Sequence, residues 1–280
     1  MKPPVFLTLA AIAACTPALA KDELHHLKLH QPKPGQTVTV RIASDSSNGR
    51  ITITRGASTQ KGTMSVKRDR TFERSLQGTG PKTSLRYKVL VDQVVSSIEL
   101  AGEKETESAS GGLVGHTAFG FRDDSGRWRL FLKGGTATGK QAIELAELEA
   151  YENRRWFPKT PVAVGQTWPI DPGFIRHLTE RDLGRATVEA TMTLKSVGMV
   201  DKEKTAVLTF SIKTLGSSEG ADGKGAGALT SLQGTIHVAL DTMLDKRIVM
   251  TGTLTTTARQ HGQSTTITLP VNYNVTKAVR

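Results

Sequence analysis

Apolar and polar residues alternate along five segments between residues 186 and 276. A period of two is typical of a β-strand that buries one face and leaves the other in solvent. Short polar breaks, such as residues 200–204 and 260–263, separate the segments and have the composition of turns. We therefore expect five antiparallel strands in a meander, with one apolar and one threonine-rich face. The apolar rows begin at Val188, Ala206, Leu232, Ile248 and Ile267.

The N-terminal half shows the same alternation less regularly, over residues 38–42, 51–53, 64–66 and 85–91. The segment Ser46–Gly49 (Ser-Ser-Asn-Gly) lies between the first two of these and predicts a turn. Apolar residues that alternate on both sides of Asp123–Gly126 predict a further hairpin. Residues 103–114 and 216–228 are rich in glycine, serine and alanine, and predict loops.

The period changes over residues 141–156, which contain neither glycine nor proline and carry apolar residues near helical spacing. This pattern predicts a helix. A shorter helix is expected to begin at Asp171-Pro172 and to end at Gly184, because a cap residue precedes a first-turn proline. The first helix carries four glutamates, which we expect on its solvated face: Glu144, Glu147, Glu149 and Glu152.

Together these elements predict a mainly β fold, either all-β or α+β. Long antiparallel meanders would form a half-open barrel or a sandwich with one or two inserted helices. A single domain over residues 21–280 is expected. The alternative is a pair of subdomains, 21–135 and 185–280, joined by a helical insert at 136–184.

Residues 1–20 have the plan of a signal peptide, with a cationic start, an apolar run and small residues before Lys21. Cleavage there would release a periplasmic or secreted protein. The alternative is a membrane-anchored lipoprotein, since Ile12–Cys15 resembles a lipobox whose cysteine is lipidated. Cys15 is the only cysteine, so the mature chain forms no internal disulfide. No later segment is long and apolar enough for a transmembrane helix.

Composition is that of a globular protein, with 37% apolar and 22% charged residues. The formal net charge of +11 favours polyanionic surroundings, which for an exported protein are anionic lipids or glycans rather than nucleic acid. The cations are nevertheless scattered, as on an ordinary solvated surface. They include Lys67, Arg68, Arg70, Lys82, Arg154 and Arg155.

Nine of the fourteen aromatic residues fall between Phe119 and Phe174. They predict either the packing of two sheets, the commoner use of large aromatics, or an apolar ligand pocket. The residues proposed for ligand binding are Phe119, Phe121, Trp128, Tyr151, Trp156 and Trp168.

Three patterns for catalysis or metal binding are incomplete. The run Gly134–Gln141 is close to a phosphate-binding loop, but Gln141 replaces the hydroxyl residue that would ligate magnesium. Ser218 lies in a Gly-x-Ser-x-Gly sequence, but a glycine-rich segment follows it where a nucleophile elbow needs a helix. The histidines at 25, 26 and 30 have no carboxylate at ligand spacing, and we expect them to be solvated. We therefore expect no catalytic residue, metal or cofactor.

Residues 158–168 read Pro-Lys-Thr-Pro-Val-Ala-Val-Gly-Gln-Thr-Trp. They resemble a Pro-x-x-Pro-Val-x-Val-Gly-[Asp/Gln]-[Ser/Thr]-Trp segment of uncharacterised exported bacterial β-rich proteins. The plan of long strands with a helical insert is also similar to the lipoprotein-carrier class, whose half-open barrel holds acyl chains. The resemblance implies an exported β protein and no particular activity.

Three functions remain open for a cell-envelope protein of this kind. The first is a non-enzymatic protein that binds a lipid or another amphiphile in an apolar groove. The second is a structural or interaction module whose basic β surface meets an anionic envelope component. The third is a hydrolase of unknown type, for which Ser218 is the one candidate nucleophile.

Overall fold

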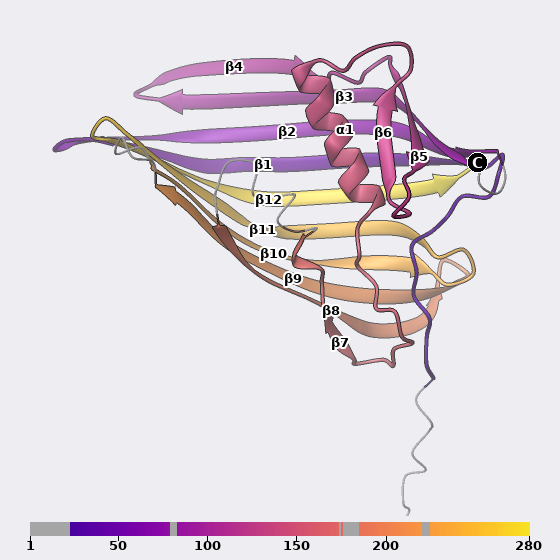
Figure 1. Ribbon diagram of the computed structural model, residues 1–280. Coiled ribbons are helices and arrows are strands. Elements are labelled where there is room, and N and C mark those ends of the chain that lie inside the picture. The colour runs from indigo at the N-terminus through magenta and orange to yellow at the C-terminus, as the bar shows by residue number, and fades with distance from the viewer. Residues whose placement is uncertain (1–22, 79–82, 174, 176–184, 220–224) are drawn as a thin grey trace, which may run out of the picture.

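The computed structural model of the protein describes residues 23–78, 83–173, 175, 185–219 and 225–280 (Figure 1). The expected signal peptide and Cys15 lie outside the described residues. Among the residues that the structure describes, no helix has the length and apolarity that crossing a bilayer requires.

The described strands form one antiparallel sheet of twelve strands in the order β6-β5-β3-β2-β1-β12-β11-β10-β9-β8-β7, with β4 also paired to β3 (Figure 1). Pairing of β1 with β12 joins the N-terminal and C-terminal meanders into one continuous sheet. The terminal strands β6 and β7 do not pair with each other, so the sheet stays open, and the expected mainly β fold is confirmed. The strands are β1 (Thr37–Arg55), β2 (Ser58–Gln77), β3 (Ser84–Leu100), β4 (Glu103–Ser110), β5 (Thr117–Arg122), β6 (Trp128–Leu132), β7 (Thr167–Pro169), β8 (Arg185–Val200), β9 (Glu203–Glu219), β10 (Gly225–Ala239), β11 (Leu244–Gln260) and β12 (Gln263–Val279).

The five strands predicted from the C-terminal alternation are β8 to β12, and the hairpin predicted around Asp123 is β5–β6. The turn predicted at Ser46–Gly49 is wrong, because β1 continues through it with a bulge opposite β2. Asn48 there has a φ of 64°. Asparagine and glycine tolerate left-handed backbone in a bulge as readily as in a turn, so the residue pattern does not distinguish the two.

The loops predicted at 103–114 and 216–228 are also wrong over most of their described length. Residues 103–110 form β4, which pairs with the end of β3. Strand β9 continues to Glu219, and β10 is already paired with it at Gly225. Small and polar residues form strand pairs through their backbones as apolar residues do. The long hairpins extend beyond the part of the sheet that is covered by the core, so their ends need no apolar face.

Helix α1 (Gly139–Glu152) confirms the predicted helix and crosses the sheet over β1, β2 and β3 (Figure 1). Thr138 caps its N-terminus in a capping box, in which the Gln141 side chain binds the Thr138 backbone. The residue that broke the resemblance to a phosphate-binding loop therefore has a structural role. Of the shorter predicted helix, residues 172, 173 and 175 are helical, and residues 176–184 lie outside the described part of the chain.

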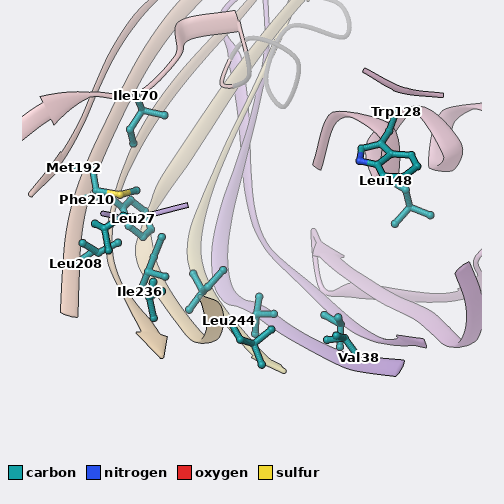
Figure 2. Close-up of a cluster of buried hydrophobic side chains, with 14 of the residues drawn as sticks. Leu27, Val38, Trp128, Leu148, Ile170, Met192, Leu208, Phe210, Ile236 and Leu244 are labelled. Atoms are coloured by element: carbon teal, nitrogen blue, oxygen red, sulfur yellow. The ribbon is translucent and has the colours of Figure 1, made fainter. Parts of the chain in front are cut away.

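The core lies on the concave face of the curved sheet (Figure 2). Met192, Phe210 and Ile236 project into this concavity from neighbouring strands, and Leu148 of α1 lies across it. The convex face carries the alternate, threonine-rich residues of β8 to β11, as the period of two predicts. The arrangement is a trough with an apolar floor, covered over part of its length by α1.

Candidate functional site

A row of aligned residues crosses the floor of the trough from β2 to β9. Directly opposed residues in antiparallel strands project from the same face, so the strand register shows that all residues of this row lie on one face of the sheet. It runs Arg70, Ile42, Val275, Ile248, Ile236 and Leu208. The row is apolar except at its β2 end, where Arg70 stands opposite Asp92 of β3.

A cavity of about 370 Å³ lies between this floor and the cover formed by α1 and the segment that follows it. Its volume is within the range of small-molecule sites, roughly 300 to 1,000 Å³. The floor contributes mainly aliphatic and aromatic side chains, and α1 contributes Glu147, Leu148 and Tyr151. Arg68 and Arg70 are the cations of its lining. The cavity is therefore apolar over most of its wall and charged at the end near β2.

Arg68 and Arg70 share Asp92 at this charged end. Arg68 donates from Nε and Nη2 to the two oxygens of Asp92, each at 2.8 Å. The hydrogen bond to Asp92, strengthened by the carboxylate charge, raises the pKa of Arg68. Arg70 Nε lies 3.3 Å from Asp92 Oδ2, and the Asp92 side chain is fully buried.

The Arg70 side chain is 6% exposed and incompletely hydrogen-bonded. Its Nε and Nη2 atoms are buried and form no hydrogen bond of good geometry with any described residue. The Glu144 and Glu147 carboxylates are 3.9 Å and 3.7 Å from the guanidinium. Buried polar groups are almost always paired, so a guanidinium with spare donors in a cavity wall suits a ligand acceptor.

Glu144 and Glu152 attach α1 to the sheet, which corrects the expectation that its glutamates are solvated. Both are buried, at 5% and 6% exposure. Glu152 accepts hydrogen bonds from Arg74 Nε and Nη2, each at 2.7 Å, and another from the Tyr87 hydroxyl. Glu144 accepts from the backbone nitrogens of residues 112 and 113, at 2.6 Å and 3.2 Å.

The two other glutamates of the helix are also paired. Glu149 receives hydrogen bonds from Arg129 Nη1 and from the Leu130 backbone nitrogen. Glu147 is the most exposed of the paired carboxylates of α1, with a side chain 33% exposed near Arg70. The expected solvated face of α1 therefore faces β2, β6 and the segment after β4.

A second network of buried charged groups lies next to the C-terminal end of α1. Lys277 donates to Asp245 Oδ2 at 2.5 Å and also contacts the Tyr151 hydroxyl. Arg154 Nη2 lies 3.3 Å from the same Asp245 oxygen. Burial lowers the pKa of Lys277 to about 8, although Asp245 acts in the opposite direction. Burial raises the pKa of Tyr151 and keeps its hydroxyl protonated.

The networks also correct the expectation that the cations form an ordinary solvated surface. Arg70 and Arg154 are buried, at 5% and 7% exposure, and Arg68 is partly buried. Lys67, one residue from Arg68, has a side chain 60% exposed on the other face of β2. Position along a strand, and not cationic character, decides which of these residues meet solvent.

The six aromatic residues predicted for ligand binding separate into two groups. Tyr151 and Trp156 line the cavity and pack edge to face, with ring centroids 6.3 Å apart. Trp168 lies next to them and donates from Nε1 to the Trp156 carbonyl.

The other three residues belong to the β5–β6 hairpin. Trp128 is buried beside α1, where its backbone binds the Asn153 side chain. Phe119 and Phe121 face away from the cavity, because the alternate residues Ala118 and Gly120 pair with the inward-facing Tyr87 and Leu85. The sequence prediction missed the aliphatic floor, for which the inward alternation of β9 to β12 was the available signal.

The other sequence patterns carry no assembled site in the described residues. His25 is buried, and His30 Nδ1 binds the Thr242 carbonyl at 2.7 Å, so the expectation of solvated histidines is wrong for both. No group of three or more metal-ligating side chains occurs within the described ranges. Ser218 is paired with Ala226 of β10 one residue before the end of β9, and it does not lie at a strand-to-helix turn.

The comparisons with known proteins place the chain in no family. No family model matches the sequence, and no curated protein matches it significantly. A solved DUF1329 family protein from Desulfovibrio piger is 11% identical over 85% of each chain, with a TM-score of 0.17. A candidate AttH protein from Nitrosomonas europaea is 9% identical over 82% of this chain and 92% of that chain, with a TM-score of 0.11. Similarity at this level supports no argument about function.

Proposed function

We propose that the protein binds an amphiphile, with its acyl chain in the cavity between α1 and the sheet. The observation that supports this proposal is the cavity itself, about 370 Å³ of mostly apolar wall with charged groups at one end. An amphiphile has the same division into an apolar chain and a polar head. Its chain would lie along the floor from β2 toward β8, with the head near Arg68 and Arg70.

The apolar wall supplies enough free energy for such binding. Burial of each methylene contributes about 0.8 kcal/mol, so a chain of ten methylenes contributes about 8 kcal/mol before costs. Loss of translational and rotational freedom costs several kcal/mol, which leaves a useful affinity only for long chains. We therefore expect affinity to rise with chain length until the cavity is filled.

Binding can be tested with a matched pair of substitutions on β9. Ile212 lines the cavity, whereas the next residue, Lys213, is exposed on the other face. Ile212→Trp fills part of the cavity and is expected to weaken uptake of a fluorescent fatty acid. Lys213→Trp adds the same side chain outside and should leave uptake unchanged.

Native mass spectrometry of protein purified from its host should show a bound lipid in the wild type and less in Ile212→Trp. A wild-type protein that is always empty, and that takes up neither a fluorescent fatty acid nor its ester, would refute the proposal. Equal uptake by both tryptophan variants would show that any binding takes place outside this cavity.

The proposed location is the bacterial cell envelope, supported by the signal-like composition of residues 1–20. We propose cleavage before Lys21, with release of a mature chain that has no lipid anchor. The intact mass of protein from the native host distinguishes this from acylation of Cys15, with Cys15→Ser as the control. An acylated Cys15 at the mature N-terminus would contradict the proposal.

A further inference from the structure

The charged end of the cavity contains five ionisable side chains that face one another. Arg68 and Arg70 supply two positive charges, and three carboxylates lie around them: Asp92, Glu144 and Glu147. The formal charge of the cluster is therefore −1 before any ligand is bound. Asp92 is held by both arginines, and Glu144 is held by backbone donors.

An anionic head group fits this cluster poorly. A carboxylate or phosphate beside Arg70 would add negative charge to a group that already has an excess of it. Like charges close together in a partly desolvated site repel strongly, because the effective dielectric constant is well below that of water. Although the whole chain has a net positive charge, the carboxylates of this cluster outnumber its cations, so the site itself is not basic.

A neutral hydrogen-bond acceptor fits the cluster better. Arg70 Nε and Nη2 are buried donors without a hydrogen bond in the described part of the chain, and Arg70 lines the cavity. A carbonyl oxygen can accept from such a donor without changing the charge of the site. Hydrogen bonds that involve a charged partner are about twice as strong as neutral ones, and a buried donor left unpaired is costly.

We propose that Arg70 recognises the carbonyl group of an ester-linked or amide-linked acyl chain, and that the cluster discriminates against the free fatty acid anion. This inference rests on the proposed function and names the class of amphiphile. The acyl chain extends from the carbonyl along the apolar floor toward Ile236 and Phe210. Glu147, whose side chain is the more exposed of the surrounding carboxylates, faces the polar remainder of the head group.

The test compares two ligands of equal chain length, 1-lauroylglycerol and laurate, by calorimetric titration at neutral pH below their micellar concentrations. The ester is expected to bind about tenfold more tightly or better, a ratio that corresponds to about 1.4 kcal/mol of repulsion between the laurate anion and the negatively charged cluster. The substitution Arg70→Gln removes the guanidinium and should weaken ester binding about tenfold. It also lowers the formal charge of the cluster to −2, so laurate binding should not improve. Arg41→Gln, on an exposed position of the opposite face of β1, is the matched control and should change neither affinity.

The outcomes separate the inference from the proposed function. If both ligands bind but laurate binds as tightly as the ester or more tightly, the inference is wrong and the proposed function stands. An unchanged ester affinity in folded Arg70→Gln also overturns the assignment to Arg70. If neither ligand binds, the proposed function fails and the inference fails with it. Should Arg70→Gln not fold, the ligand comparison on the wild type alone decides.

Discussion

The substitution Glu152→Gln isolates the contribution of one buried charge to the attachment of α1. Glu152 and Arg74 are 6% and 7% exposed, and two hydrogen bonds of 2.7 Å join the carboxylate to the guanidinium. Glutamine keeps the size of the side chain but removes its charge and turns one acceptor into a donor. The variant therefore leaves a buried arginine without its counter-ion.

Removing one partner of a buried ion pair typically costs about 3 to 5 kcal/mol, because the remaining charge stays desolvated and unpaired. Domains are stable by about 5 to 15 kcal/mol, so this loss is a large share of the total. The Tyr87 hydroxyl, which donates to the same carboxylate, also loses part of its interaction. We expect the free energy of unfolding of Glu152→Gln to fall by an amount in this range.

Equilibrium unfolding in guanidinium chloride, followed by circular dichroism and tryptophan fluorescence on residues 21–280, measures the loss. Glu149→Gln is the control on the same helix. Its ion pair with Arg129 is much more exposed, with side chains 22% and 51% exposed, so solvent screening should leave only a small loss. A double variant, Arg74→Met with Glu152→Met, removes both charges and should be more stable than Glu152→Gln. If Glu152→Gln costs no more than Glu149→Gln, the assigned role of the buried pair is wrong.

Three further predictions concern stability. The folded-state pKa of Lys277 is about 8 against a usual 10.5, so the unfolded chain binds more protons between these values and stability should rise with pH across that window. Lys277→Met should flatten this rise in unfolding experiments from pH 7.5 to 10. Gly234→Ala would place a Cβ against the Val249 carbonyl oxygen and 2.5 Å from Phe210 Cζ, and should cost about 1 to 3 kcal/mol in denaturant titration. Gly198→Ala meets nothing within 4 Å and should be nearly neutral. Thr138→Ala removes the cap of α1 and should cost about 1 kcal/mol in the same assay.

The strand pattern was predictable because it is a local property of the chain. Alternation of apolar and polar residues follows from the two faces of a strand, and β8 to β12 show it over the segments from which they were predicted. The turn predicted at residues 46–49 failed because the choice between a bulge and a turn depends on the partner strand. Strand β12, more than two hundred residues away, pairs with β1 both before and after the bulge.

The floor of the cavity was partly predictable, but its cover was not. The inward rows of β9 to β11 could be identified from their period, and they supply Phe210, Ile236 and Ile248. Which aromatic residues reach the cavity depends on the direction of the β5–β6 hairpin. Phe119 and Phe121 differ from Trp128 only by the face on which each lies, and pairing with β3 determines that face.

The buried glutamates of α1 show that a helical pattern alone does not predict which charged residues of the helix are buried. Glu144, Leu148 and Glu152 are spaced four residues apart and form one stripe, so two charges share the buried face of the helix with an apolar residue. Strand β2 has the complementary feature, because Arg70 and Arg74 occupy inward positions opposite apolar residues of β1.

Each feature alone is typical of a solvated surface, since an isolated charge is rarely buried. Taken together, inward arginines on a strand and glutamates on the apolar stripe of a helix require each other, because neither set is stable in the core alone. This pairing of inward charges across two elements is a signal that a sequence can supply before its structure is known. In this sequence, that signal would have predicted that α1 packs against β2.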